Sequence, residues 1–274
     1  MKKFLALMLA LMLVATCFAG CGKKAEPAPA PTAAPTEAPA PTEAPAPTAE
    51  PEPEPACMSY AEYCAAELDS EVVVETYVQA KQGWWEKDGQ GVATFYTESE
   101  EGGYFLYNMP CTKEEYDLLG EGTKLRVTGF KSEWSGEVEI IDAAFEILEG
   151  EGAYVAEPLD VTALLGTDEL IEKQNRKVAF SAMTVAPSTD PDGNEVAFLY
   201  NWDGSGSDGD DLYFNVLCGG NVYNFTVESY LCGAGSEVYE AVKALEVGQT
   251  VDVEGFLYWY EGANPHVTSV SIVG

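Results

Sequence analysis

Hydrophobic and polar positions alternate along much of residues 57–274, in short segments typical of β-strands. Val72, Val74 and Val78 share one face of an alternating run, and Leu125 and Val127 do the same against polar neighbours. A period of two belongs to a strand with one buried face. In the first half of this region the pattern predicts strands over residues 72–80, 93–97, 103–109, 124–131 and 137–148.

Two short helices are predicted from capping boxes, in which a Ser or Thr begins the helix and a Glu three residues later bonds back to it. Ser59 and Glu62 predict a helix through about residue 68, and Thr112 and Glu115 predict one over residues 113–119. The predicted order of the first half is therefore a helix, three strands, a helix and two strands.

The second half resembles the first, which indicates a duplication. Residues 116–136 align without a gap with residues 242–262, so that Gly129 matches Gly255 and Trp134 matches Tyr260. Weaker matches align residues 71–80 with 177–186 and residues 104–111 with 211–218, which makes residues 219–231 an insertion. The second half is predicted to hold helices over residues 161–173 and 237–245 and strands over 177–185, 194–202, 211–217, 251–260 and 266–273.

Three strands, a helix and two more strands follow the order of the OB fold, a small Greek-key barrel. Gly129-Phe130 and Gly255-Phe256 resemble the glycine pattern of the fourth OB strand, where a missing side chain lets the strand bend. The chain resembles tandem OB-type surface lipoproteins of anaerobic Gram-positive bacteria, a group without a settled activity. We expect a mainly β protein with two OB-like barrels; an SH3-like barrel and a small β-sandwich are the alternatives.

The amino terminus resembles that of a bacterial lipoprotein. A basic start and an apolar run lead to small residues before Cys21, as in a lipobox, although Phe18 replaces the usual aliphatic residue. The resemblance implies cleavage before Cys21 and lipidation of its thiol, with residues 1–20 as the signal peptide; the alternative is a secreted protein cut nearby. Residues 21–56, rich in Pro, Ala, Thr and Glu, are expected to form a linker without a core. Domains are expected over residues 57–150 and 151–274.

Acidic residues dominate the chain and lie mostly in the predicted barrels. The 274 residues include 46 acidic and 14 basic side chains, for a net charge of −32 at pH 7. Residues 57–150 hold 20 acids against 6 bases, and residues 151–274 hold 20 against 4. OB domains that bind nucleic acid use basic grooves. We therefore expect the membrane, through the lipid anchor, and carbohydrate or a surface protein as partners, and no nucleic acid.

Aromatic side chains gather in the connections that border the usual ligand face of an OB barrel. The candidate ligand-face residues are Trp84, Trp85, Trp134, Tyr258, Trp259 and Tyr260. Exposed aromatic faces beside carboxylates suit a sugar, because the apolar ring faces stack and the acids accept hydroxyl protons. Adjacent residues of a strand point to opposite faces, so at most one of Trp84 and Trp85 needs to be buried. The alternative is that these side chains plug the barrel ends.

Metal, thiol and histidine chemistry have weaker candidates. Asp203, Asp208 and Asp210 concentrate carboxylates in a Gly/Ser loop that suits Ca²⁺, with a solvated acidic hairpin as the alternative and no other cofactor expected. Cys218 and Cys232 bracket the predicted insertion and are a candidate disulfide pair. His266, the only histidine, is expected at the surface or at a strand edge. No recognisable catalytic motif stands in the chain, so we lean against an enzyme.

Together these patterns predict a lipid-anchored protein on the extracellular face of a Gram-positive-like cell membrane. We expect a non-catalytic binding or adaptor module, for carbohydrate or for a cell-surface partner. An extracellular hydrolase, or an accessory domain of one, is the first alternative, and a structural spacer is the second.

Overall fold

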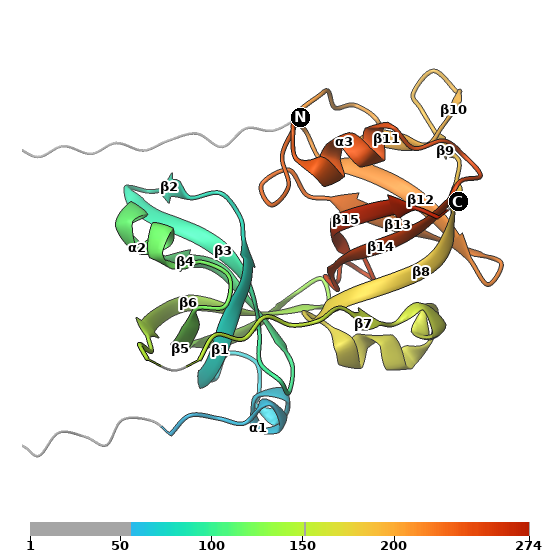
Figure 1. Cartoon of the computed structure of the whole chain (residues 1–274). Coiled ribbons are helices and arrows are strands. Elements are labelled where there is room, and N and C mark those ends of the chain that lie inside the picture. Colours follow the sequence, from blue (N-terminus) through green and yellow to red (C-terminus); the bar gives the residue numbers. More distant parts are fainter. Residues whose placement is uncertain (1–55, 151, 274) are drawn as a thin grey trace, which may run out of the picture. The chain divides into compact units, whose positions relative to one another are not determined.

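The computed structural model describes residues 56–150 and 152–273, and Figure 1 shows their helices and strands. The predicted signal peptide, Cys21 and nearly all of the predicted linker lie outside the described residues. Both predicted domains fall in a single compact unit of the chain. No helix of the described residues is long and apolar enough to cross a membrane.

The first half forms a closed five-stranded barrel. Its strands are β1 (Glu71–Lys81), β3 (Gln90–Glu98), β4 (Gly103–Pro110), β5 (Lys124–Trp134) and β6 (Glu137–Ile147). They pair in the cyclic order β1-β3-β4-β6-β5-β1, with β4 and β6 parallel and the other pairs antiparallel. Helix α2 (Lys113–Leu118) lies between β4 and β5 in sequence, and β2 (Trp85–Lys87) extends the sheet beyond β3. This connectivity is that of the OB fold.

The second half repeats the same connectivity. Its strands are β8 (Lys177–Ala186), β12 (Leu212–Cys218), β13 (Asn221–Val227), β14 (Thr250–Phe256) and β15 (His266–Ile272), with α3 (Glu237–Lys243) between β13 and β14. They pair in the order β8-β12-β13-β15-β14-β8. As in the first barrel, the third and fifth strands, here β13 and β15, run parallel, and the other pairs of the ring are antiparallel. The prediction of a mainly β protein with the OB fold is confirmed.

The glycines of the fourth strands sit where each strand bends. The pairing of β5 with β6 shifts register between Thr128 and Phe130, and that of β14 with β15 shifts at Gly255. A Cβ on Gly129 would lie 2.7 Å from Ile140 Cγ2, and one on Gly255 would lie 2.3 Å from the His266 carbonyl oxygen. Because neighbouring strands approach this closely, only glycine fits at these bends.

The predicted capping boxes are present. Ser59 and Glu62 exchange bonds at the start of α1 (Tyr60–Ala65), and Thr112 and Glu115 do so at the start of α2. Each box satisfies backbone N–H groups that a short helix would otherwise leave unpaired.

The predicted strand order of the second half was wrong at two positions. Residues 211–218 form β12, the second strand of the barrel, while the third strand is β13, within the residues assigned to an insertion. The extra segment lies earlier, at residues 187–211, and contains β9 (Ser188–Thr189), β10 (Glu195–Val196) and β11 (Phe198–Tyr200). Alternation identifies a strand but not its partner, so a match between residues 104–111 and 211–218 could not fix the order.

Two further boundaries differ from the prediction. The helix predicted over residues 161–173 is a pair of 3-10 segments, η1 (Thr162–Leu164) and η2 (Asp168–Lys173), and a short strand β7 (Leu159–Asp160) precedes them. Strand β14 ends at Phe256, so Tyr258, Trp259 and Tyr260 lie in the connection that follows it.

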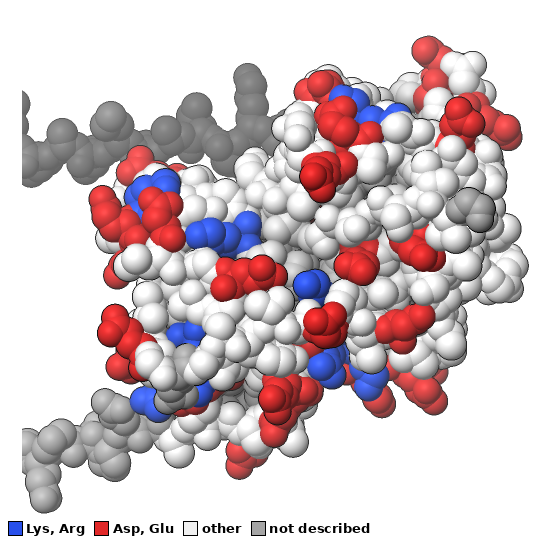
Figure 2. Space-filling model, viewed as in Figure 1, with Lys and Arg blue, Asp and Glu red and all other residues white. Residues whose placement is uncertain are grey.

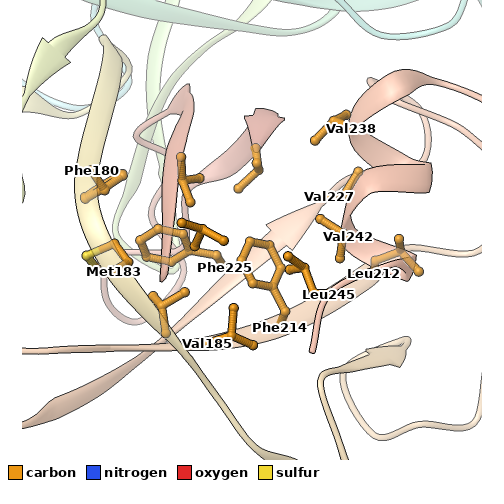
Figure 3. Close-up of a cluster of buried hydrophobic side chains, with 14 of the residues drawn as sticks. Phe180, Met183, Val185, Leu212, Phe214, Phe225, Val227, Val238, Val242 and Leu245 are labelled. Atoms are coloured by element: carbon orange, nitrogen blue, oxygen red, sulfur yellow. The ribbon is translucent and has the colours of Figure 1, made fainter. Parts of the chain in front are cut away.

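Each barrel has its own apolar core. In the second, the Phe180, Phe214 and Phe225 rings meet beneath α3, whose Val238 and Val242 close the barrel end (Figure 3). In the first, inward residues of β1 and β5 such as Val74 and Val127 are completely buried with the other core side chains. Burial of this kind is the main stabilising contribution of the fold.

The surface keeps the acidic character of the composition. Acidic side chains are spread over the face seen in Figure 2, and the few basic side chains lie beside them. Lys124 and Arg126, for example, both contact the Glu75 carboxylate of the neighbouring strand.

Candidate functional site: an aromatic cleft between the barrels

Aromatic side chains of the two barrels meet in a third, smaller apolar cluster. Tyr96 of β3 stacks on Phe256 of β14 with 4.6 Å between ring centroids, and Phe105 of β4 meets Tyr258 edge to face at 5.5 Å. Alongside this cluster, Arg176 Nε donates to Glu98 Oε1 at 2.8 Å, and the Lys177 backbone N–H donates to Glu98 Oε2 at 2.7 Å. The first barrel and the start of the second are thus joined by both apolar and charged contacts.

His266 belongs to this junction and is buried at the first position of β15, so the position at a strand edge is confirmed and the surface alternative is wrong. Its ring stacks on Tyr258, and its Nδ1 lies 2.6 Å from the Tyr96 hydroxyl. Gln82 Nε2 donates to the same hydroxyl at 3.1 Å, which leaves the hydroxyl proton for Nδ1. Burial lowers the pKa of His266 to about 3, so the imidazole is neutral at physiological pH and accepts this bond.

Next to the junction lies a cleft of about 930 Å³, lined by side chains of both barrels. Its aromatic lining consists of Trp85, Phe105, Tyr107, Trp134, Trp202, Tyr213, Tyr230, Tyr258 and Tyr260. Its uncharged polar lining includes Gln82, Thr94, Asn108, Asn224, Thr226 and Asn264. Aromatic walls with a few amide and hydroxyl groups are typical of small-molecule and oligosaccharide sites.

Four of the six predicted ligand-face residues line this cleft. They are Trp85, Trp134, Tyr258 and Tyr260. Trp134 is 55% exposed, and its ring centroid lies 5.2 Å from that of Tyr260, the residue that matches it in the repeat. Matching positions of the two sequence halves therefore meet at the cleft, with their rings tilted by 41°.

The other two predicted residues are half-buried and pack against the barrel cores. Trp84 packs against the core of the first barrel and covers Gly91, and its Nε1 donates to the Cys111 carbonyl at 3.0 Å. Trp259 packs against the core of the second barrel and over Gly136 of the first. Of the adjacent pair, Trp84 is half-buried against the core and Trp85 is exposed; Trp84 precedes β2 (Trp85–Lys87), so its contacts with Gly91 and Cys111 rather than strand alternation set its position.

Five aromatic residues of the cleft were not among the predicted ligand-face residues: Phe105, Tyr107, Trp202, Tyr213 and Tyr230. Tyr213 could have been found, because it stands between the apolar residues Leu212 and Phe214 of an alternating strand and must face outward. Trp202 lies in the segment between β11 and β12, which has no counterpart in the first barrel, so the repeat gave no signal for it.

Two carboxylates, Asp211 and Glu228, stand opposite each other at one end of the cleft. Leu212 of β12 pairs with Val227 of β13, so the antiparallel register brings Asp211 opposite Glu228. Asp211 Oδ1 accepts from the Ser229 N–H at 2.8 Å, and Glu228 Oε2 accepts from the Leu231 N–H at 2.8 Å. Burial, and then the Asp211 charge, raise the pKa of Glu228 to about 7.

A third carboxyl group, Glu137, is fully buried where the hairpins of the two barrels meet. Its Oε2 accepts from the Trp259 N–H at 2.8 Å and from Gln174 Nε2 at 3.2 Å, whereas Oε1 has no partner among the described residues. Burial raises the pKa of Glu137 to about 9, so this carboxyl is protonated at neutral pH and acts as a neutral part of the junction.

The carboxylates of the acidic loop predicted for Ca²⁺ are engaged by backbone N–H groups of the loop and by one lysine of α3. Asp203 accepts from the Ser205 N–H, Asp210 accepts from the Ser207 N–H, and Asp208 pairs with Lys243 of α3 at 2.8 Å. Within the described part of the chain, no three His, Cys, Asp or Glu side chains are gathered as metal ligands.

The thiols of the candidate disulfide, Cys218 and Cys232, are free in the structure and pack against the core of the second barrel. Their places in the fold follow from the corrected strand order. Cys218 ends the second strand of its barrel, whereas Cys111 follows the third strand of the first barrel, so these two cysteines are not equivalent as the repeat alignment had them.

No protein-family model matches the chain, and no curated protein matches it either. Similar solved structures include a replication protein A heterotrimer bound to single-stranded DNA, with 11% identity, a TM-score of 0.31 and coverage of 74% of this chain and 48% of that one. Others are a murine DNA-binding protein bound to double-stranded DNA (10%, 0.35, 74% and 98%) and the single-stranded DNA-binding protein from Thermus aquaticus (14%, 0.23, 74% and 92%). The chain spans about half the length of the replication protein A chain.

The expected exclusion of nucleic acid as a partner is contradicted by these structures. Two of the three hold DNA, single-stranded in one and double-stranded in the other. The exclusion rested on net charge alone, which describes the average surface rather than one groove, and it is withdrawn. The similarity is one of fold and assigns no ligand to this chain.

Proposed function

We propose that the protein is a non-catalytic carbohydrate-binding module and that its ligand lies in the cleft between the barrels. The observation that carries the proposal is the joint lining of one cleft by exposed aromatic rings and neutral hydrogen-bonding groups from both barrels. Sugar rings present apolar faces to aromatic side chains and hydroxyl groups to amides and carboxylates.

The cleft is also held in a fixed shape, which favours binding over a spacer role. Thr226 Oγ1 donates to Asn264 Oδ1 at 3.1 Å, and the Gly83 N–H of the first barrel donates to the Tyr230 carbonyl of the second at 2.9 Å. A site whose walls are fixed before the ligand arrives loses less entropy on binding.

A hydrolase is the second candidate, because Glu228, with its pKa raised to about 7, stands opposite Asp211 in the cleft. Two carboxyl groups of which one has a raised pKa are the arrangement used for glycoside hydrolysis. Both groups, however, hold backbone N–H groups of the same turn. Binding therefore remains the preferred function, and release of reducing ends from a bound oligosaccharide would establish hydrolysis instead.

The proposal includes an extracellular location through a lipid on Cys21, which lies outside the described residues. It rests on the lipobox resemblance of residues 18–21. In a bacterial host that processes lipoproteins, the protein should fractionate with membranes, and Cys21→Ala should release it into the medium.

A glycan array with cell-wall and plant oligosaccharides tests the binding function. We expect the protein to bind at least one oligosaccharide class, and Trp134→Ala to weaken that binding by about tenfold or more through the lost ring face. Leu118→Ala is the matched control, since it removes an exposed apolar side chain of α2 outside the cleft.

Two results would contradict the proposed function. One is an absence of binding to every oligosaccharide. The other is a single-stranded oligonucleotide that binds with Trp134-dependent affinity while no oligosaccharide does.

A further inference from the structure

The charges that line the cleft are all of one sign. Asp211 and Glu228 are its acidic residues, and no Lys or Arg belongs to the lining formed by the described residues. His266 also lines the cleft, but its imidazole is neutral because burial lowers its pKa to about 3. The cleft thus offers negative charge and aromatic faces but no positive group to an incoming ligand.

The carboxylates meet because of strand register rather than because of a basic partner. Asp211 directly precedes β12 and Glu228 directly follows β13, and like charges held near each other repel. Neither Asp211 nor Glu228 forms an ion pair with a Lys or Arg in the described part of the chain, although such pairs stabilise Glu75 and Glu98 elsewhere. A cation placed between Asp211 and Glu228 would relieve this repulsion.

Aromatic rings stand beside the two carboxylates. Tyr213 of β12 stands two residues after Asp211 and lines the cleft together with both carboxylates. Tyr230, two residues after Glu228, is 70% exposed and also lines the cleft. The face of a tyrosine attracts a cation, most strongly where water is partly excluded.

We infer that this end of the cleft binds a protonated amine, so that the preferred carbohydrate carries free amino groups, as in a glucosamine oligomer. The inference rests on the proposed function and names its ligand class. The ammonium group would lie between the Asp211 and Glu228 carboxylates and against the Tyr213 and Tyr230 rings, while the sugar rings stack on the aromatic walls.

Acetylation of the amine removes its charge and adds bulk at the same position. The N-acetylated oligomer is therefore the matched neutral ligand for a test, since it keeps the ring, the linkage and the hydroxyl groups. A preference for the free amine measures the joint contribution of the two carboxylates and the two tyrosine rings, and the Glu228→Gln variant isolates that of one carboxylate.

The experiment is calorimetric titration of the protein with a glucosamine hexamer and with an N-acetylglucosamine hexamer at pH 7.0, where Glu228, with a pKa of about 7, is about half ionised before an ammonium group binds. We expect the glucosamine hexamer to bind about tenfold more tightly. Glu228→Gln, which keeps an oxygen for the Leu231 N–H, should bring the two affinities within about threefold by weakening only the amine-bearing ligand. Glu254→Gln, which removes an exposed charge on β14 outside the cleft, should leave the preference unchanged.

Equal affinity for both hexamers, or tighter binding of the acetylated one, would overturn the inference and leave the proposed function standing. The inference also falls if neutral oligosaccharides bind but neither hexamer does, or if pentalysine competes as well as the glucosamine hexamer. Failure of every oligosaccharide to bind would instead overturn the proposed function.

Discussion

The two barrels share one topology, but the connections between their fourth and fifth strands have different roles. In the first barrel, the tight turn between β5 and β6 leaves Trp134 exposed in the cleft. In the second, the longer connection after β14 turns inward, and Trp259 packs against the core. The tips of both connections meet, since the Glu261 N–H donates to the Ser135 carbonyl at 2.8 Å. The first connection thus contributes Trp134 to the cleft wall, whereas the second contributes Tyr258 and Tyr260 to the same wall and anchors itself through Trp259.

Alanine substitution of Trp134 and of Trp259 should distinguish these roles, because the two variants should lose very different amounts of stability. Trp259→Ala removes a packed ring from the second core and from the surface of Gly136, and should cost about 3 kcal/mol of unfolding free energy. Trp134→Ala should cost less than about 1 kcal/mol, because the ring is already half in solvent. Urea unfolding followed by circular dichroism measures both, and equal losses would show that the two connections are not distinct.

Alanine substitution of Gly129 and of Gly255 tests whether the two barrels tolerate an added side chain equally at the bend of the fourth strand. Gly255→Ala places a Cβ 2.3 Å from a backbone oxygen, whereas Gly129→Ala meets first the Cγ2 of Ile140, a side-chain atom, at 2.7 Å. Backbone yields less than a side chain, so we expect a loss of about 2 kcal/mol for Gly255→Ala and a smaller one for Gly129→Ala. Thermal unfolding of the two variants gives the ranking, and the reverse order would contradict the account.

Glu137 makes the junction sensitive to pH, whereas the matching position of the second barrel holds Ala263. The pKa of Glu137 in the folded protein, about 9, lies above its usual value near 4.5, so the folded state keeps a proton that the unfolded state releases between these pH values. Stability should therefore fall as pH rises through this window, by at most about 1.4 kcal/mol per pH unit for one proton.

Glu137→Gln keeps the acceptor for the Trp259 N–H and removes the titration. Between pH 5 and pH 8 the urea midpoint of this variant should fall less than that of the unchanged protein, by the equivalent of up to about 4 kcal/mol over the three pH units. Glu133→Gln, at an exposed position of β5, is the control and should keep the pH dependence unchanged. Parallel midpoint curves for all three proteins would mean that Glu137 is ionised in the folded state.

Much of the fold could be predicted because its signals are local. Alternation located the strands of the first barrel, capping boxes located α1 and α2, and Gly129 and Gly255 marked the bends. The order of β12 and β13 could not be predicted, because strand pairing depends on contacts between distant residues and the extra segment at residues 187–211 displaced the alignment.

The cleft was predictable only in part for the same reason. Alternation predicted that at most one of Trp84 and Trp85 needs to be buried, but contact with Gly91 decides which one. The contact between Tyr96 and His266 joins residues 170 positions apart and leaves no trace in local sequence. The sequence therefore predicts that aromatic residues are available for a site, but it does not predict that they form one surface where the two barrels meet.

The chain's five tryptophans provide the most direct test of the cleft as the binding site. The protein labelled with 5-fluorotryptophan and titrated with the glucosamine hexamer should show fluorine resonance shifts for Trp85, Trp134 and Trp202, which line the cleft. The resonances of Trp84 and Trp259, packed against the two cores, should stay in place. Shifts confined to Trp84 and Trp259, or saturable binding that moves none of the three cleft resonances, would contradict the central claim.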